Sequence, residues 1–269
     1  MKKMTAFLLA AVLCLALAAC GDSTGSGEAA ESNEEMRLLE PGRLIVATEA
    51  SFPPYEMPAA DGAGVADTGL EGIDIEIAAA VADRLGLELV VKDITFDEAL
   101  CAPENGKADL VMAAISVSPE REAFMLFSEP YAPGDQVVIT KDSVDPKKKY
   151  DFKEKQLGAV KNTTGWIYAA DDYGEKQVTV FASNADAVRA VLSGEIDAFV
   201  LDRAPAEAIL KQIDGLVMLD KPYTKGEYVI GMAKDNPGLQ KAVDQALAAL
   251  DDDGTLQEII ERYIPNPGL

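Results

Sequence analysis

The chain alternates short apolar strands with amphipathic helices, and this alternation limits its fold more than any other feature. Residues 43–48 (RLIVAT) form a β-branched apolar run that predicts a buried strand. Residues 73–85 place apolar side chains at helical spacing, and Gly86 follows as a candidate C-cap. Further elements are expected as strands at 87–91 and 108–112 and a short helix at 96–102. This strand–helix–strand order predicts a mostly parallel sheet flanked by helices.

The second half of the chain repeats a short pattern from the first. Residues 105–112 (NGKADLVM) resemble residues 193–200 (SGEIDAFV), because in each a helix ends at Gly and an Asp then opens an apolar strand. The match is too short to establish a sequence repeat, but it suggests two lobes of similar α/β architecture with a cleft between them. Residues 141–155 are charged and contain Pro, so they predict a surface loop. Two amphipathic helices are expected near 238–250 and 255–263.

The first forty residues predict an export signal and a tether. A positively charged start precedes an apolar run at 7–17, which is too short for a comfortable transmembrane helix of about 20 residues. Residues 17–21 (LAACG) resemble the bacterial lipoprotein cleavage box, in which Cys20 becomes the lipidated first residue of the mature chain. An ordinary signal peptide that contains this Cys is the alternative. We expect a leader at 1–19 and a lipid-anchored, acidic, flexible tether at 20–40.

Composition excludes several classes of function. The 269-residue chain has 24 Lys and Arg against 46 Asp and Glu, a formal net charge of −22 that opposes binding to nucleic acid and to anionic lipid. It contains no His, which excludes a Ser-His-Asp triad, His-ligated zinc and imidazole acid–base chemistry. Once the leader is lost and Cys20 is lipidated, Cys101 is the remaining thiol, and we expect it to be a small buried apolar residue. We expect no metal and no cofactor.

A series of short motifs runs in order through residues 40–265. They are TEASFPPYE (48–56), GLEGID (69–74), GKAD (106–109), SVSPER (116–121), FSEPY (127–131), GEID (194–197), DRAP (202–205) and DGTL (253–256). Together they resemble the bacterial extracellular solute-binding proteins of family 3, the polar amino acid-binding lipoproteins of ABC transporters.

The resemblance implies an α/β, two-lobed periplasmic-binding-protein-like (type II) fold. Each lobe is then a mostly parallel sheet flanked by helices, and the ligand binds in the cleft between the lobes. The expected boundaries are 41–133 plus 230–269 for lobe 1 and 134–229 for lobe 2. The hinge strands are expected near 133–136 and 228–231.

Two side chains are candidates for the charged ends of an amino acid zwitterion. Ser118 and Pro119 predict a helix start that places Arg121 in the first turn, where a cation and backbone N–H groups form an anion site. The resemblance assigns Arg121 to the ligand's α-carboxylate; the alternative is a solvated Arg or one paired with a neighbouring Glu. Asp202 follows the apolar run 196–201, at the strand end where open α/β sheets bind ligands. The resemblance assigns Asp202 to the α-ammonium, and capping of the next helix is the alternative.

The resemblance also supplies a turn and two rings. Thr163 and Thr164 match a turn that completes the carboxylate site from lobe 2, and a helix N-cap there is compatible with that role. Asn162 stands where the family usually has Gly, and Asn tolerates a left-handed backbone better than most residues. Phe52 and Phe96 match the aromatic positions that sandwich the ligand side chain, with a core role as the alternative for each.

Three further positions follow from the same resemblance. Ser116 and the backbone at Ala114 match positions that hydrogen-bond the α-carboxylate and α-amino groups. Glu49 matches an acidic position that faces the ligand's distal cation in relatives that bind basic amino acids. A solvated loop carboxylate is the alternative for Glu49.

These observations predict a non-enzymatic, substrate-binding lipoprotein of an amino acid ABC importer. It would capture a polar amino acid, with a lean towards a basic one, by hinge closure and deliver it to a membrane permease. We expect a monomer anchored through Cys20 on the extracytoplasmic face of the membrane, at the cell surface in a Gram-positive or in the periplasm in a Gram-negative.

Two alternatives stay open. One is a dehydratase-like enzyme on the same scaffold that acts on a cyclic carboxylic acid, with Glu49 or Asp202 as general acid. The other is a ligand-sensing lipoprotein without transport.

Overall fold

The computed structural model describes residues 35–145, 147 and 151–264. The predicted leader and Cys20 lie outside the described residues, as does most of the predicted tether. Among the described residues, no helix combines the length and the apolar character needed to cross a membrane.

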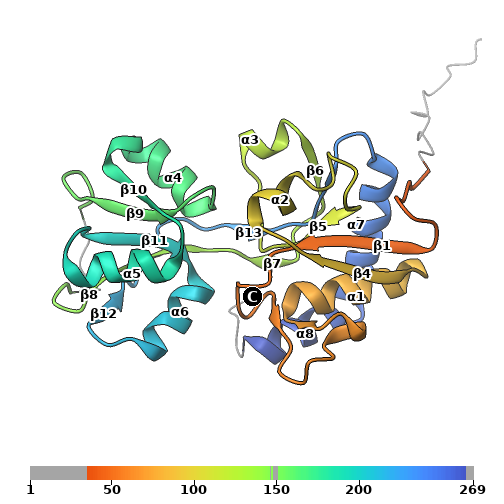
Figure 1. Ribbon diagram of the computed structural model, residues 1–269, viewed down its shortest axis with the longest axis horizontal. Helices are drawn as coiled ribbons and strands as arrows, with labels where there is room; N and C mark the ends of the chain where they lie inside the picture. The colour runs from red at the N-terminus through yellow and green to blue at the C-terminus, as the bar shows by residue number, and fades with distance from the viewer. Residues whose placement is uncertain (1–34, 146, 148–150, 265–269) are drawn as a thin grey trace, which may run out of the picture. The chain divides into compact units, whose positions relative to one another are not determined.

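Two five-stranded sheets organise the chain (Figure 1). The strands of the first sheet are β1 (Arg43–Thr48), β4 (Glu88–Asp93), β5 (Leu110–Val111), β6 (Met125–Phe127) and β14 (Gly231–Ala233). Those of the second are β8 (Gln136–Lys141), β9 (Leu157–Val160), β10 (Val178–Phe181), β11 (Ala198–Asp202) and β12 (Leu216–Met218). Short antiparallel pairs join β2 (Met57–Pro58) to β3 (Leu70–Glu71), and β7 (Ala132–Pro133) to β13 (Glu227–Tyr228).

The two sheets share one strand pattern. The order is β4–β1–β5–β14–β6 in the first and β10–β9–β11–β8–β12 in the second. In each, the fourth strand (β14 or β8) runs antiparallel to its neighbours, while the other strands run in one direction. The two-lobed α/β fold with mostly parallel sheets is therefore confirmed.

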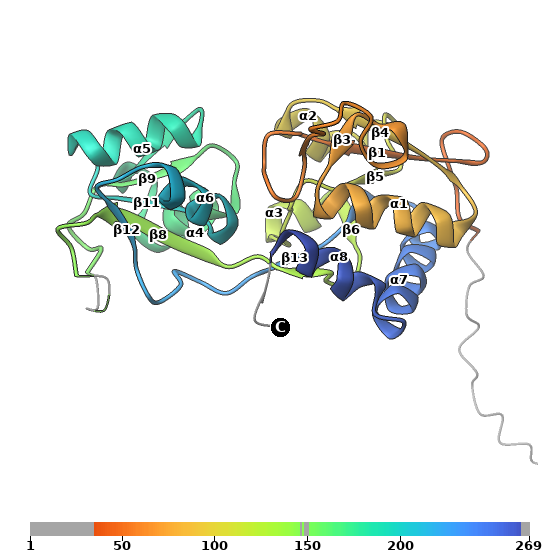
Figure 2. The same ribbon diagram turned by 90° about the horizontal axis from the view of Figure 1, so that it is seen from below.

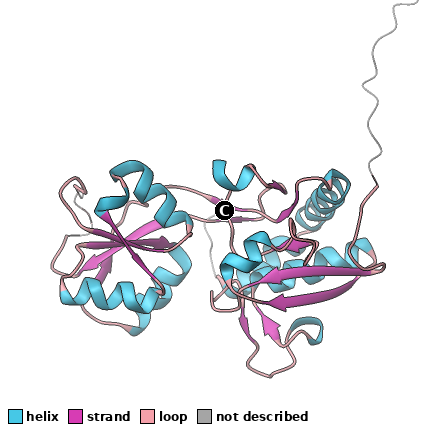
Figure 3. Ribbon diagram, turned by 45° about the horizontal axis from the view of Figure 1, so that its top comes forward, coloured by secondary structure: helices cyan, strands magenta, loops and turns pink. Residues whose placement is uncertain are grey.

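Helices cover both faces of each sheet. In the first lobe they are α1 (Ile73–Leu85), α2 (Phe96–Cys101), α3 (Pro119–Glu122), α7 (Pro237–Asp252) and α8 (Thr255–Tyr263), with the single turn η1 (Val65–Asp67). In the second lobe they are α4 (Thr164–Tyr173), α5 (Asn184–Ser193) and α6 (Arg203–Gln212), with the turn η2 (Glu175–Gln177). Figure 3 shows the magenta strands of each lobe enclosed by cyan helices.

The central strands divide their side chains between two cores. Leu44 and Val46 of β1 pack into the core that α1, α7 and α8 share, and Figure 2 shows these three helices side by side. Ile45 and Ala47 point into the opposite core, which includes α2. In the second lobe, β11 divides its side chains in the same way between a core with α5 and α6 and a core with α4. Burial on both faces explains why these strands are continuous apolar runs.

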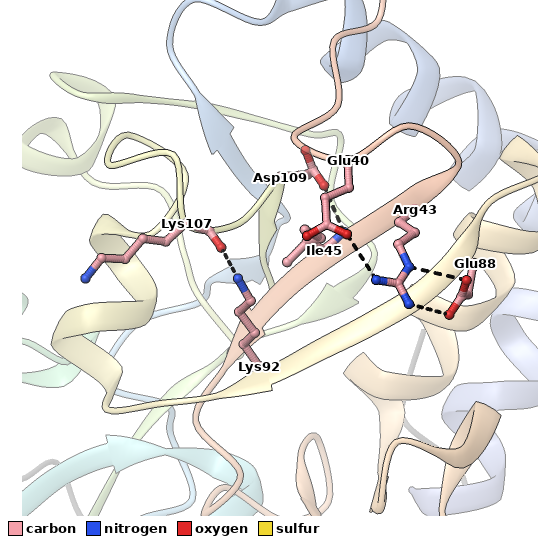
Figure 4. A network of polar contacts seen from close by, with 7 residues as sticks. All are labelled: Glu40, Arg43, Ile45, Glu88, Lys92, Lys107 and Asp109. Atoms are coloured by element: carbon pink, nitrogen blue, oxygen red, sulfur yellow. Dashed lines mark hydrogen bonds and ion pairs between the residues drawn. The ribbon is translucent and has the colours of Figure 1, made fainter.

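The short repeated motif has the same contacts in both lobes. Asp109 donates its N–H to the carbonyl of Ile45 (2.8 Å) and accepts the Ile45 N–H at Oδ2 (2.8 Å; Figure 4). Asp197 makes the same pair of bonds with Gln156, at 2.8 and 2.9 Å. Each Asp thus fixes the start of a central strand, β5 or β11, to the neighbouring strand. The predicted similarity of the two lobes is confirmed at this point.

Two segments cross between the lobes side by side. In the β7–β13 pair, Pro133 lies opposite Glu227 and Ala132 opposite Tyr228. The first crossing leads into β8 and the second into β14, the antiparallel strand of each sheet. The predicted hinge segments fall on these crossings, while bending there and the lobe boundaries stay predictions.

Most element boundaries agree with the sequence, and one burial prediction is wrong. The elements at 43–48, 73–85 and 255–263 match, and Gly86 caps its helix in the left-handed conformation (φ 69°). The strand expected at 87–91 covers residues 88–93, and that at 108–112 shortens to 110–111. Cys101 was expected to be buried but is exposed, because α2 turns Ala99 and Leu100 towards the core and its last residue outwards.

Candidate functional site

A cleft of about 700 Å³ is lined by residues of both lobes. It brings together eight of the nine residues that the sequence indicated for ligand binding: Glu49, Phe52, Phe96, Ala114, Arg121, Thr163, Thr164 and Asp202. The ninth, Ser116, is buried next to Arg121 and contacts it through its carbonyl.

Arg121 lies in the first turn of α3, as predicted. Ser118 is the N-cap, and its Oγ accepts the Arg121 N–H (3.3 Å). The residue is 4% exposed, and its guanidinium donates to two backbone carbonyls, Ser116 O (2.8 Å) and Asn162 O (3.1 Å). Burial lowers the pKa of Arg121, and the attraction of Asp202 opposes that fall. The result is a fixed cation whose bonds reach both lobes.

Asp202 is the last residue of β11, and its carboxylate accepts hydrogen bonds from side chains in or next to the two segments that cross between the lobes. The residue is 8% exposed, and Oδ1 accepts from Tyr228 OH (2.6 Å) and Gln136 Nε2 (2.5 Å). It occupies the N-cap position of α6, but its side chain makes no capping bond, so the alternative role as a helix cap is not the one observed. Burial raises the pKa of Asp202 to about 6, while both hydrogen bonds and the charge of Arg121 act against this rise. The group is therefore mainly an anion at neutral pH.

The turn before α4 belongs to the second lobe and contacts the first. Asn162 adopts the left-handed conformation (φ 61°), which Asn tolerates better than most residues. Thr163 is the N-cap of α4, where Oγ1 accepts the Trp166 N–H (3.5 Å), and the buried Thr164 begins the helix. Asn162 Nδ2 donates to Asp97 Oδ1 on α2 (2.7 Å). The side chain that replaces the usual Gly thus makes a direct bond from the second lobe to the first.

The two predicted rings lie at the cleft and also touch the cores. Phe52 is half-buried in the loop after β1, and Phe96 is half-buried at the start of α2. Arg121 Cζ lies 5.9 Å from the centre of the Phe96 ring, within cation–π range. Each ring also packs against one of the first lobe's cores, so the core and cleft positions coexist.

The remaining predicted positions combine engaged and unengaged groups. Ala114 has a left-handed backbone (φ 46°), and its N–H donates to Asp74 Oδ2 (2.8 Å). Ser116 is 3% exposed, and its Oγ has no hydrogen-bond partner among the described residues. Glu49 is half-buried and accepts from Ser51 Oγ (2.5 Å).

Several neighbours of the predicted residues were not themselves predicted. Glu56, Asp97 and Ser183 line the cleft, and Gln136 and Tyr228 support Asp202 from behind. Ser183 could have been found, because it follows β10 at the strand end where such sheets bind ligands. The other residues have no local sequence pattern that marks them, because Asp97, Gln136 and Tyr228 bond to side chains far away in the sequence.

Comparison with known proteins identifies the family. The profile of the "Bacterial extracellular solute-binding proteins, family 3" matches residues 44–266. The chain belongs to this family. It is similar to the arginine-binding extracellular protein ArtP of Bacillus subtilis, with 27% identity over 98% of both chains. It is 28% identical to the L-cystine-binding protein TcyJ of Escherichia coli over 84% of both chains. Among solved structures, an ancestral arginine-binding protein bound to arginine matches with a TM-score of 0.71 and 32% identity, covering 86% of this chain and all of that one.

Proposed function

We propose that this chain captures a polar amino acid, with preference for a cationic side chain, as the binding component of an ABC importer. The observation that carries the proposal is the pair of buried opposite charges in one cleft. Arg121 belongs to the first lobe and Asp202 to the second. A zwitterionic amino acid presents the complementary pair, and its charged ends must exchange water for such partners.

The groups around Arg121 suit a carboxylate. Two of its five N–H groups bond to backbone carbonyls, and a ligand carboxylate would be a stronger, charged acceptor for this guanidinium. The first turn of α4 at Thr164 adds backbone N–H groups and the positive end of a helix dipole. The unpartnered hydroxyl of Ser116, buried next to Arg121, is a further donor near this end, whereas the Thr163 hydroxyl already donates to the carbonyl of Val160 (2.8 Å).

The groups around Asp202 suit an ammonium. Tyr228 and Gln136 both bond to Oδ1, which leaves acceptor capacity at Oδ2 for a ligand N–H. The N–H of Ala114 is engaged by Asp74, so its carbonyl is the backbone group that can accept from the same ammonium. Because the two charged sites come from different lobes, both are satisfied together only when the lobes close on the ligand.

The side-chain end of the cleft favours a cation. Phe52 and Phe96 offer ring faces, and Glu49 and Asp97 line the same space as carboxylates. ArtP and the ancestral protein are described as arginine-binding, which supports this preference. TcyJ is described as cystine-binding, so a neutral polar side chain is the competing outcome of the test below.

The cellular setting completes the proposal. We infer a leader at 1–19, lipid on Cys20 and a monomer held at the extracytoplasmic face of the membrane, which delivers its ligand to a permease. We propose no enzymatic step. A sensing role without transport would use the same cleft, and neighbouring permease and ATPase genes separate the two.

A thermal-shift screen of the purified chain against the twenty amino acids, ornithine and cystine tests the proposal. A ligand that binds only the folded state stabilises it by RT ln(1 + [L]/Kd), which is about 4 kcal/mol at a thousand times Kd. We expect the largest shift with arginine, lysine or ornithine, and its loss in Arg121→Ala and Asp202→Ala. No shift with any α-amino acid would overturn the proposal, and a shift with cyclic carboxylic acids instead would favour the dehydratase-like alternative.

A further inference from the structure

Two buried carboxyl groups lie together in the first lobe, one of them at the wall of the cleft. Glu56 follows the loop after β1, and Asp74 lies in the first turn of α1; the residues are 1% and 0% exposed. The Asp74 N–H donates to the carbonyl of Tyr55 (2.9 Å), the residue before Glu56, so the two buried residues are neighbours. Two neighbouring carboxylate anions in a buried site would repel strongly, and a proton on one of them replaces this repulsion with a hydrogen bond.

The hydrogen-bond partners indicate which group holds the proton. Asp74 Oδ2 accepts the Ala114 N–H (2.8 Å), and Oδ1 accepts from Tyr131 OH (2.7 Å). Glu56 Oε2 has no hydrogen-bond partner among the described residues. Donors stabilise an anion, so the charge belongs on Asp74 and the proton on Glu56.

The surroundings act in the same direction. Besides Asp74, the charged groups that face Glu56 are the carboxylates Glu49 and Asp202, and the phenols of Tyr55 and Tyr131 lie close to the pair. Burial first, and then Asp74, raise the pKa of Glu56 well above its usual range. Burial raises the pKa of Asp74 to about 6, against the bonds from its donors.

The backbone is built to bring the two carboxyl groups together. Gly72 has φ 129°, and a Cβ there would lie 2.2 Å from Tyr55 O and 3.0 Å from Glu56 N. Only Gly therefore lets α1 start against this loop, where the Asp74 N–H donates to Tyr55 O (2.9 Å). The pair depends on a close approach that other residues would prevent.

We propose that Glu56 holds a proton shared with Asp74 at neutral pH, and that this pair positions two cleft segments. On one side it fixes Ala114 in a left-handed backbone that non-glycine residues seldom adopt. On the other, Glu56 exchanges backbone bonds with Phe52 at 3.0 and 3.2 Å and so holds the loop that carries this ring. Removal of the proton places a second negative charge beside Asp74 and loosens both segments. The ligand-contact roles of Ala114 and Phe52 rest on the proposed function; the shared proton does not.

The first experiment uses the ligand-free protein. Infrared difference spectra at neutral pH should show a protonated carboxylic acid band that is absent in Glu56→Gln and retained in Glu104→Gln, an exposed Glu of the same lobe. Unfolding at neutral pH should release about one proton more from the parent than from Glu56→Gln, because the Glu56 carboxyl ionises once unfolding exposes it to water. An identical band and proton count in the parent and Glu56→Gln would overturn the proposal.

The second experiment measures L-arginine affinity as a function of pH. The Gln amide of Glu56→Gln can donate to Asp74 but does not titrate, so its affinity for L-arginine should lack the fall at alkaline pH that the parent shows. Asp74→Asn should weaken binding by roughly tenfold, because an amide cannot accept at both positions. The same pH profile in the parent and Glu56→Gln, or unchanged binding in Asp74→Asn, would refute the positioning role. If the parent binds no amino acid, the proposed function fails while the infrared band and proton count still decide the shared proton.

Discussion

Replacing Asp202 with Asn should stabilise the ligand-free protein and weaken ligand binding at the same time. Burial raises the pKa of this carboxyl from 3.8 to about 6, so the folded state holds its proton more tightly than the unfolded state does. Stability is then lost as the pH rises from about 4 through about 6, and the loss at pH 7 is about 3 kcal/mol. An amide does not ionise, and its oxygen can still accept from Tyr228 and Gln136. The variant therefore avoids the loss.

Binding should change in the opposite direction. Asp202 is 8% exposed, so its carboxylate is a buried, charged acceptor for the ligand ammonium. In Asp202→Asn the ammonium faces a neutral amide instead. Removing one member of a buried, hydrogen-bonded charge pair costs about 2–5 kcal/mol, and a central value of about 3 kcal/mol is about 150-fold in Kd.

Urea unfolding at pH 4 and pH 7, with calorimetric titration of L-arginine at pH 7, measures both effects. We expect Asp202→Asn to match the parent in stability at pH 4 and to exceed it by about 3 kcal/mol at pH 7. Asp214→Asn, at an exposed carboxyl of the same lobe, is the matched control and should change neither quantity. A variant that is less stable than the parent at pH 7, or that binds arginine equally well, would refute this reasoning.

Three further substitutions test separate contacts. Arg121→Lys should weaken arginine binding by at least about tenfold in a calorimetric titration, because one ammonium cannot reproduce the two-pronged guanidinium, and parent-like binding would contradict this. Asn162→Gly removes the bond to Asp97 and should speed ligand dissociation about fivefold in stopped-flow fluorescence; an unchanged rate would show that this bond does not hold the lobes together. Gly72→Ala should lower the free energy of unfolding by more than about 2 kcal/mol in urea, because its Cβ would lie 2.2 Å from Tyr55 O, and a change within about 0.5 kcal/mol would dispute the close approach.

Features with local causes could be predicted from the sequence. The helix at 73–85 follows from its apolar spacing and from Gly86, and both are confirmed. Arg121 falls in a first turn because Ser118 caps and Pro119 starts that helix, which is chemistry within a few residues. The family resemblance indicated eight of the residues that line the cleft.

Features with distant causes could not be predicted. Gln136 lies 66 residues before Asp202 and Tyr228 lies 26 residues after it, so no local pattern links them to that carboxylate. Glu56 looks like an ordinary loop carboxylate until α1 brings Asp74 against it. Cys101 is exposed although a free Cys is usually buried, because that general preference does not decide which way the last residue of the six-residue helix α2 faces.

The most direct test of the central claim compares L-arginine with two analogues that each lack one charged end. Agmatine has no carboxylate for Arg121, and 5-guanidinopentanoate has no ammonium for Asp202. In calorimetric titrations of the ligand-free chain, we expect arginine to bind and each analogue to bind at least about 100-fold more weakly. An analogue that binds as tightly as arginine would contradict capture of a zwitterion between the two lobes.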